Sequence, residues 1–221
     1  MRTLTTLGLL IAAFSSLFYF LDSHLEKFYI FEPAHLHALS KKAIALYGND
    51  TTAVVNHIVS DLHANYPAHV NLDEEWMFNN AGGAMGARYN NRLYIIHASV
   101  TEYVIIFGSA VGTEGHSGRH TADDYFIILK GTELAYKPGP GSYQPEVYPQ
   151  GSMHHMKRGE VKQYKMDEAC FALEYARGWI PPMLFFGYAD TFTSTLDFST
   201  LWRTTYVTGR EMLGNLANMK L

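Results

Sequence analysis

The N-terminal segment places the strongest constraint on how this chain can fold. Residues 3–21 read TLTTLGLLIAAFSSLFYFL and carry no charged side chain. At about 1.5 Å per residue, a helix of this length nearly spans the roughly 30 Å hydrocarbon core of a bilayer. A cleaved signal peptide is the alternative, but Phe18, Tyr19 and Phe20 lie where small cleavage-site residues are required. We therefore predict a transmembrane anchor over residues 1–21 and a single ligand-binding domain over residues 22–221.

The charges that flank this segment predict its orientation. Arg2 and the α-amino group precede it, whereas Asp22, Glu26 and Lys27 follow it. Because loops rich in Lys and Arg stay in the cytosol, we expect a cytosolic N-terminus and a lumenal body. That topology would expose the glycosylation sequon that begins at Asn49.

The composition excludes several classes of protein. Of the 221 residues, 48% are hydrophobic, and 17 Lys and Arg against 21 Asp and Glu give a net charge of −4. A chain this apolar is not disordered, and it has no run of basic residues with which to bind nucleic acid. The single cysteine, Cys170, provides neither an intrachain disulfide nor a cysteine metal site.

The spacing of apolar residues divides the body into three parts. They recur every three or four positions over residues 33–66, which predicts two short helices. Residues 84–180 contain segments rich in β-branched and aromatic residues between turn signals, which predicts a small β-barrel or sandwich. Residues 181–221 are apolar with few charges, which predicts amphipathic helices that lie on a membrane or cap the barrel. The expected strands lie within residues 93–108, 125–129, 146–148, 161–164 and 170–175.

Two acidic residues in strand-like, apolar sequence are candidates for chemistry. Glu174 lies in CFALEYARG, where alternation puts it on one face with Ala172 and Ala176. A charge in such a segment is costly unless it is paired or neutralised, so Glu174 is either a reactive carboxyl group or the partner of Arg177. Glu102 in SVTEYVIIFG is likewise a charge in an apolar, strand-like segment, and we expect it to have a structural role.

A second acidic element is the pair Asp123 and Asp124 in GRHTADDYF. On an extended strand the two side chains point to opposite faces, so that one of them faces the core. The competing interpretation is a solvated turn in which they pair with Arg119.

Eleven histidines raise the question of a metal site. His116 and His120 are four residues apart, but GHSGRH reads as a turn that does not fix their geometry. His154 and His155 are adjacent and would point in opposite directions on a strand. We therefore expect structural histidines and no metal centre of the cupin type.

Two long motifs resemble a known family. TEYVIIFGSAVGTEGHSGRHTADDYF (residues 101–126) and EYARGWIPPMLFFGYADTFTSTLDF (residues 174–198) are similar to fungal sterol C-8 isomerases, relatives of the sigma-1 receptor. The resemblance covers essentially the whole chain. It implies a mainly β fold with α-helices, a cupin-like β-barrel with an N-terminal transmembrane helix and C-terminal membrane-lying helices. It also implies a homotrimer in the endoplasmic reticulum membrane.

The resemblance further implies site residues. Glu174 matches the carboxylate that meets the ligand's amine in the sigma-1 receptor, and Tyr103 matches the tyrosine that hydrogen-bonds it. The receptor's second pocket carboxylate falls opposite Phe126, so the acidic partner must be Asp123 or Asp124. Strand parity favours Asp124, because it shares a face with position 126. The resemblance places these further residues around the ligand: Ala84, Tyr89, Leu93, Ile95, Ile105, Phe107, Met166 and Leu184.

The chemistry of such an isomerase explains two carboxyl groups in an apolar barrel. Protonation of a Δ8 sterol at C9 creates a carbocation at C8, and loss of a C7 proton leaves the Δ7 alkene. The reaction needs no redox cofactor. It needs a neutral acid near pH 7, which burial and a nearby like charge supply by raising a carboxyl pKa. The remaining charge and the rings of Tyr103 and Phe107 would stabilise the cation, and cationic lipophilic amines would imitate it.

Three functions therefore stand side by side. The leading hypothesis is a sterol Δ8 to Δ7 isomerase of ergosterol biosynthesis. The alternative is a non-enzymatic sigma-type receptor for lipophilic amines, and the third is a metal-dependent cupin enzyme. The acidic pair in GRHTADDYF favours the isomerase, because it follows the fungal pattern.

Overall fold

The computed structural model describes residues 2–78, 91–139 and 143–221, in two compact units. The first unit, Met1–Ile30, contains helix α1 (Arg2–Asp22) and a short 3-10 helix η1 (Leu25–Phe28). Within α1, Thr3–Asp22 is long and apolar enough to cross a membrane. The second unit, Phe31–Leu221, contains all the strands and the remaining helices of the described chain.

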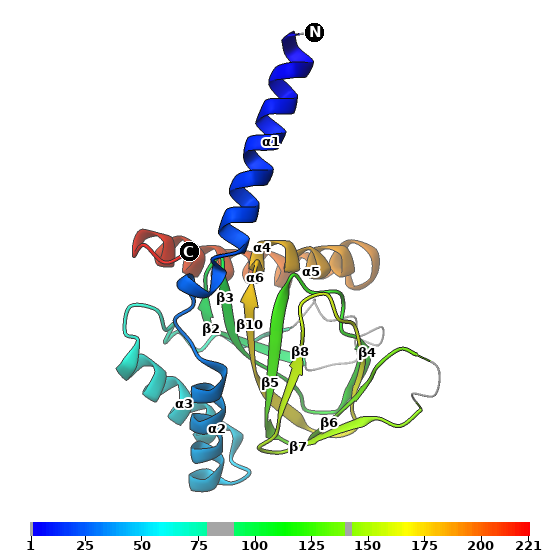
Figure 1. Cartoon of the computed structure of the whole chain (residues 1–221). Helices are drawn as coiled ribbons and strands as arrows, with labels where there is room; N and C mark the ends of the chain where they lie inside the picture. Colours follow the sequence, from blue (N-terminus) through cyan, green and yellow to red (C-terminus); the bar gives the residue numbers. More distant parts are fainter. Residues whose placement is uncertain (1, 79–90, 140–142) are drawn as a thin grey trace. The chain divides into compact units, whose positions relative to one another are not determined.

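In the described residues, ten strands form two antiparallel sheets (Figure 1). The larger sheet has the order β1-β2-β3-β10-β5-β8, and the smaller has the order β4-β9-β6-β7. The strands are β1 (Met77–Phe78), β2 (Asn91–Ala98), β3 (Glu102–Ser109), β4 (Thr113–His116), β5 (Ala122–Lys130), β6 (Thr132–Tyr136), β7 (Glu146–Pro149), β8 (Met153–Met156), β9 (Gln163–Met166) and β10 (Cys170–Gly178).

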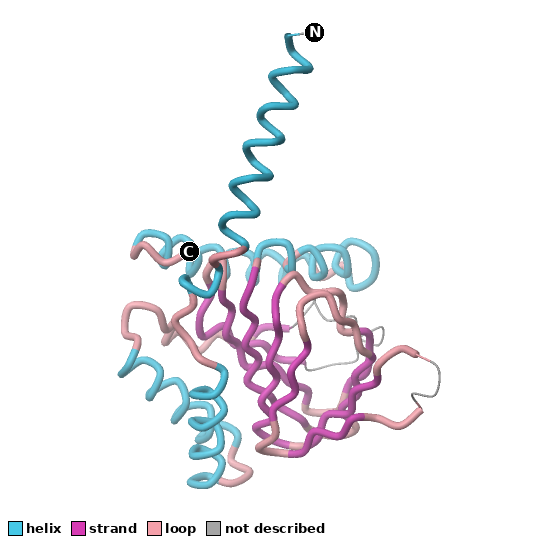
Figure 2. Tube along the Cα trace, in the orientation of Figure 1, coloured by secondary structure: helices cyan, strands magenta, loops and turns pink. Residues whose placement is uncertain are grey.

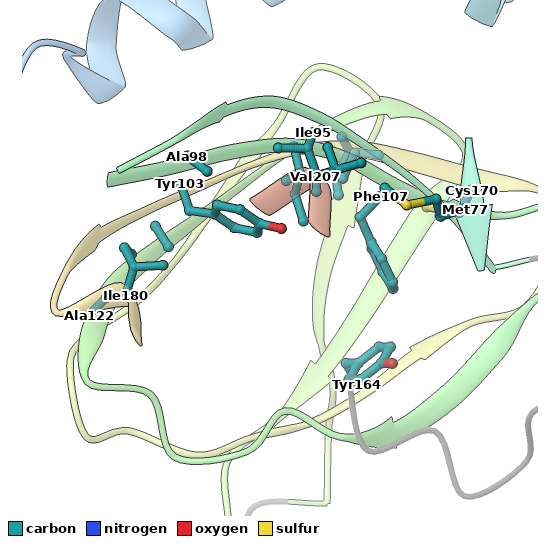
Figure 3. Close-up of a cluster of buried hydrophobic side chains, with 14 of the residues drawn as sticks. Met77, Ile95, Ala98, Tyr103, Phe107, Ala122, Tyr164, Cys170, Ile180 and Val207 are labelled. Atoms are coloured by element: carbon teal, nitrogen blue, oxygen red, sulfur yellow. The ribbon is translucent and has the colours of Figure 1, made fainter. Parts of the chain in front are cut away.

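The core lies between the two sheets, and strand alternation determines which side chains enter it. In β3, Tyr103, Ile105 and Phe107 belong to this core. From the smaller sheet Tyr164 points toward the same space, and Figure 3 shows its ring opposite that of Phe107. The intervening β3 residues face outward and are also buried, and helices lie over the outer face of this sheet (Figure 2).

Helices α2 (Pro33–Tyr47) and α3 (Thr51–Asn65) form this outer layer (Figure 2). Pro33 suits the first turn of α2, and Gly48 with φ of +59° ends it. The Asp50 side chain accepts a hydrogen bond from the Ala53 N–H (3.1 Å) and thereby caps α3. Both helices contact β5.

The C-terminal helices lie across one end of the sheets (Figure 1). Asp197 caps the last of them by accepting a hydrogen bond from the Thr200 N–H (3.0 Å). Val207 and Thr208 on this helix are buried, whereas Trp202 is 72% exposed. These segments are α4 (Ile180–Met183), α5 (Phe185–Asp190), the π-helix η2 (Thr191–Thr195) and α6 (Phe198–Ala217).

The mainly β fold with helices is confirmed, and strands occur in every segment where the sequence predicts them. The interpretation of GHSGRH as a turn is wrong at its start, because β4 extends to His116 and pairs with β9. Strands β6 and β8 were not expected, since neither contains a run of β-branched residues.

Glu102 has the structural role that we expected. It is fully buried on the outer face of β3, and the Lys220 ammonium lies 2.8 Å from its Oε2. Tyr175 Oη and the Phe31 N–H donate to its Oε1 at 2.7 and 3.0 Å. The carboxylate is thus paired and hydrogen-bonded, as a buried charge must be.

Candidate active site

A cavity of about 540 Å³ lies between the two sheets and extends to the C-terminal helices. A volume of this size suits a small-molecule ligand. Of the expected ligand-binding residues, five side chains line it: Tyr103, Ile105, Phe107, Met166 and Leu184. The walls near α4 and α6 add Ile180, Met183, Leu201 and Met212.

The other four expected residues divide into three whose side chains are not described and one that lies outside the cavity wall. Ala84 and Tyr89 lie outside the described residues, as does the side chain of Leu93. Ile95 is in the buried core and not in the cavity wall. The reason is its place in the sheet, because Ile105 on β3 stands between Ile95 and the strand that carries Glu174.

Glu174 faces the cavity from the middle of β10. Its cross-strand neighbours are Ile105 and Phe126, and the methyl groups of Ala172 and Ala176 precede and follow it on the same face. Burial in this apolar wall raises the pKa of Glu174 well above its usual value, and the carboxyl groups of Asp124 and Glu133 raise it further. Glu174 is therefore suited to be a neutral acid near pH 7.

Arg177 does not neutralise Glu174. It lies on the opposite face of β10, where its guanidinium group donates to Tyr125 Oη (3.0 Å) and lies 5.3 Å from the Tyr125 ring centroid. The interpretation of Glu174 as half of an ion pair with Arg177 is therefore not supported.

Asp123 and Asp124 point to opposite faces of β5. Asp124 faces inward and is fully buried, whereas the Asp123 side chain is 36% exposed. Asp123 accepts a hydrogen bond from the Arg158 N–H (3.0 Å) and lies 3.4 Å from His155 Nε2. The solvated turn paired with Arg119 is therefore wrong, since the segment is a strand.

Asp124 and Glu174 are diagonal neighbours on the inner face. Asp124 pairs with Ala176, and Ala176 pairs on its other side with Tyr103. Glu174 is two positions before Ala176, which puts it diagonally across from both Asp124 and Tyr103, roughly 7 Å away by Cα. The small Ala176 side chain leaves room between them.

The sequence analysis treated His120 as a structural histidine and missed its contact with Asp124. Its Nδ1 lies 2.8 Å from Asp124 Oδ2, and its Nε2 lies 2.8 Å from the Ser117 carbonyl oxygen. His120 lines the cavity, whereas Asp124 lies behind it. Burial lowers the pKa of His120, but the hydrogen bond and charge of Asp124 outweigh it and raise the pKa above its usual value. The signal in the sequence was the HTADD segment, in which His120 precedes Asp124 by four residues.

The two hydrogen bonds of His120 fix where its protons lie. The Ser117 carbonyl only accepts, so Nε2 carries a proton. The contact between Nδ1 and Asp124 Oδ2 then holds one shared proton, as imidazolium with carboxylate or as imidazole with carboxylic acid. Asp124 Oδ1 is buried and has no hydrogen-bond donor among the described residues.

Tyr103 and His154 also line the cavity. The Tyr103 hydroxyl lies 3.3 Å from Thr208 Oγ1 on α6, and burial together with the charge of Glu174 raises its pKa. His154 faces inward and His155 outward, as strand alternation predicts. Among the described residues, no group of three or more His, Cys, Asp or Glu side chains is placed to hold a metal ion.

Comparison with known proteins gives a family match over most of the chain. The family described as ERG2 and Sigma1 receptor like protein matches residues 8–220. The "C-8 sterol isomerase ERG2" of Gibberella zeae is 66% identical over 100% of this chain and 91% of its own length. The "C-8 sterol isomerase" of Neurospora crassa is 63% identical over 96% of this chain and 81% of its own length. The "Sigma non-opioid intracellular receptor 1" of Gallus gallus is 37% identical over 89% of this chain and 86% of its own length.

Among solved structures, the chain is similar to cupins. A RmlC-like cupin from Shewanella frigidimarina has a TM-score of 0.40 and 11% identity, and the match covers 50% of this chain and 90% of that chain.

Proposed function

The chain belongs to the family of ERG2 and Sigma1 receptor like proteins, and we propose that it is a C-8 sterol isomerase that moves a sterol double bond from Δ8 to Δ7 in ergosterol biosynthesis. The observation that carries the proposal is the diagonal pair of inward carboxyl groups, of which Glu174 lines the cavity and Asp124 is fully buried behind its wall. This arrangement suits a reaction that adds one proton to a hydrocarbon skeleton and removes another.

Glu174 is the proton donor. Because the pKa of Glu174 is raised, a fraction of the protein molecules carries a protonated Glu174 near neutral pH. This protonated form can protonate C9. Delivery of the proton leaves the Glu174 carboxylate next to the carbocation at C8. That negative charge stabilises the intermediate most strongly after the proton has moved, so the interaction favours the transition state over the ground state.

The His120–Asp124 pair accepts the proton from C7. Both ring nitrogens of His120 are engaged, Nε2 with the Ser117 carbonyl and Nδ1 with Asp124 Oδ2, so the accepting atom is Asp124 Oδ1, which has no hydrogen-bond donor among the described residues. The C7–H bonding pair becomes the new C7–C8 double bond, and the released proton passes to the pair. Its transfer back to Glu174 restores the starting state, so one turnover consumes no net proton.

The apolar walls protect the carbocation from water. Tyr103 and Phe107 present their rings to the same cavity (Figure 3), and aromatic faces attract a cation. The same features would bind a lipophilic amine, whose permanent charge takes the place of the transient one.

The chain also has features of a membrane protein. We propose that α1 anchors it in the endoplasmic reticulum membrane with the body in the lumen, and that α4 to α6 lie on the bilayer surface. The homotrimer stays a prediction from the family resemblance. The support for surface contact is a set of large apolar side chains that the C-terminal helices leave exposed: Phe185, Phe192, Leu196, Phe198, Trp202 and Leu213.

A single assay separates the three functions. The full chain, in membranes, is incubated with a zymosterol-type Δ8 sterol in the presence of a metal chelator, and the Δ7 product is measured. Turnover that survives the chelator and disappears in Glu174→Gln supports the isomerase, since the amide keeps the shape but does not transfer the proton. Amine binding without turnover would indicate a receptor, and turnover abolished by the chelator would indicate a metal enzyme.

A further inference from the structure

A second polar cluster lines the cavity on the side of the smaller sheet. Glu133 on β6, His154 on β8 and Lys162 just before β9 all reach the cavity, and each is at most 3% exposed. The family resemblance gives these residues no role, and the proton-transfer steps above involve them only through the effect of Glu133 on the pKa of Glu174. Charged groups buried in an apolar cavity are costly, so they call for an explanation.

The hydrogen bonds of this cluster have a definite direction. Lys162 Nζ donates to Glu146 and to His154 Nε2, the latter at 2.8 Å. An ammonium group only donates, so Nε2 carries no proton and the proton of a neutral His154 sits on Nδ1. Nδ1 lies 3.3 Å from Glu133 Oε1, which therefore accepts. The Tyr148 ring is stacked on His154 with a centroid distance of 4.3 Å and holds the imidazole in this orientation.

One atom of the cluster is left without a partner. Glu133 Oε2 is buried, and none of the described residues donates a hydrogen bond to it. The hydroxyl groups at the opposite end of the cavity are already engaged, since Thr205 donates to the Leu201 carbonyl (2.7 Å) and Thr208 contacts Tyr103. Glu133 Oε2 is thus an unsatisfied acceptor in the part of the chain that the structure describes, and a ligand hydroxyl can satisfy it.

The position of this cluster relative to Glu174 fits a sterol. Glu174, Phe126 and His154 form a continuous inward row across β10, β5 and β8. Glu174 and His154 are therefore two strand spacings apart, about 9.5 Å between backbones. In a Δ8 sterol the 3β-hydroxyl group is on ring A and the reacting double bond is on the adjacent ring B.

We propose that Glu133, oriented by His154 and Lys162, accepts a hydrogen bond from the 3β-hydroxyl group of the sterol. Ring A then lies between β6 and β8, ring B lies against Glu174, and the aliphatic tail extends toward α4 and α6. This inference rests on the proposed isomerase function and specifies how that site selects and orients its substrate.

The test compares two substrates and three proteins. A Δ8 sterol with a 3β-hydroxyl group and its 3-deoxy analogue are given to the wild-type full chain, to Glu133→Leu and to Glu133→Gln. We expect the wild type to favour the hydroxyl sterol by roughly 10- to 100-fold in kcat/KM, the range for a hydrogen bond to a charged group. Glu133→Leu should lose this preference through KM, while any change in kcat caused by the loss of a negative charge near Glu174 should be the same for both sterols. Glu133→Gln, which keeps an acceptor, should recover part of it.

The outcomes separate this inference from the function on which it rests. Equal kcat/KM for both sterols with wild-type protein would overturn the inference alone, even if Glu133→Leu did not fold. A preference for the hydroxyl sterol that survives undiminished in folded Glu133→Leu would also overturn it, because it would mean that another group binds the 3β-hydroxyl. No turnover of any Δ8 sterol by the wild type would overturn the isomerase function, and the hydroxyl site with it.

Discussion

The two neighbouring aspartates of β5 provide a matched pair of substitutions. Asp124→Asn changes a fully buried carboxyl group beside Glu174, and Asp123→Asn makes the same chemical change one residue away on the outer face. Any effect that comes only from replacing a carboxylate by an amide is the same in both variants and cancels in the comparison. The difference in activity then measures what the inward position contributes.

The structure gives the expected size of each effect. In Asp124→Asn the amide can donate to Nδ1 of a neutral His120, so that the pair no longer holds a mobile proton. Loss of general acid–base catalysis typically lowers kcat by 10²- to 10⁴-fold. In Asp123→Asn the amide oxygen still accepts from the Arg158 N–H, and only an exposed contact with His155 is weakened. Such a change is worth about 0.5 kcal/mol, or about twofold.

The assay is Δ8 to Δ7 turnover by both variants at matched protein levels, with thermal unfolding to verify that each is folded. Equal losses in the two folded variants would refute the argument from strand parity. A larger loss in Asp123→Asn would place the second catalytic group on the outer face and remove Asp124 from the mechanism.

Three further predictions follow from other parts of the structure. Lys220→Met should lower the free energy of unfolding by about 3–5 kcal/mol, because it leaves the buried Glu102 carboxylate without its cation. Thermal denaturation checks this, with Lys165→Met as a control at an exposed ion pair. Glu174→Gln should weaken binding of a lipophilic amine by roughly 3–5 kcal/mol but leave a neutral isostere nearly unaffected, and equal losses in a competition assay would show that Glu174 only shapes the cavity. If the body is lumenal, Asn49→Gln should abolish a glycosidase-sensitive shift in electrophoretic mobility, and a wild-type chain without that shift would contradict the topology.

The inward carboxyl groups were predictable because they depend on local geometry. Strand alternation alone places Glu174 with the two alanines and separates Asp124 from Asp123. The helices near the N-terminal end of the body were predictable for the same kind of reason, since apolar spacing repeats within each helix. In both cases the signal lies within a few consecutive residues.

The polar cluster around Glu133 was not predictable, because it depends on pairing between distant strands. TELAY has only five residues and includes a charge, so nothing in it indicates a buried strand. Its burial arises because β6 pairs with β9, while His154 comes from the other sheet. The link between Lys220 and Glu102 has the same origin, since it joins the end of the chain to an early strand.

Position 126 explains how one cavity accommodates two polar sites. Phe126 lies between Glu174 and His154 in the inward row, so an aromatic ring separates the proton donor from the cluster that binds the hydroxyl group. A carboxyl group at this position would place a third negative charge beside Glu174 and compete for its proton. With the acid at position 124 instead, the same strand face puts it beside His120 and leaves an apolar surface for the steroid rings. In the proposed mechanism, a shift of two residues along one strand thus moves the second carboxylate away from the cross-strand neighbour of Glu174 and places it beside His120.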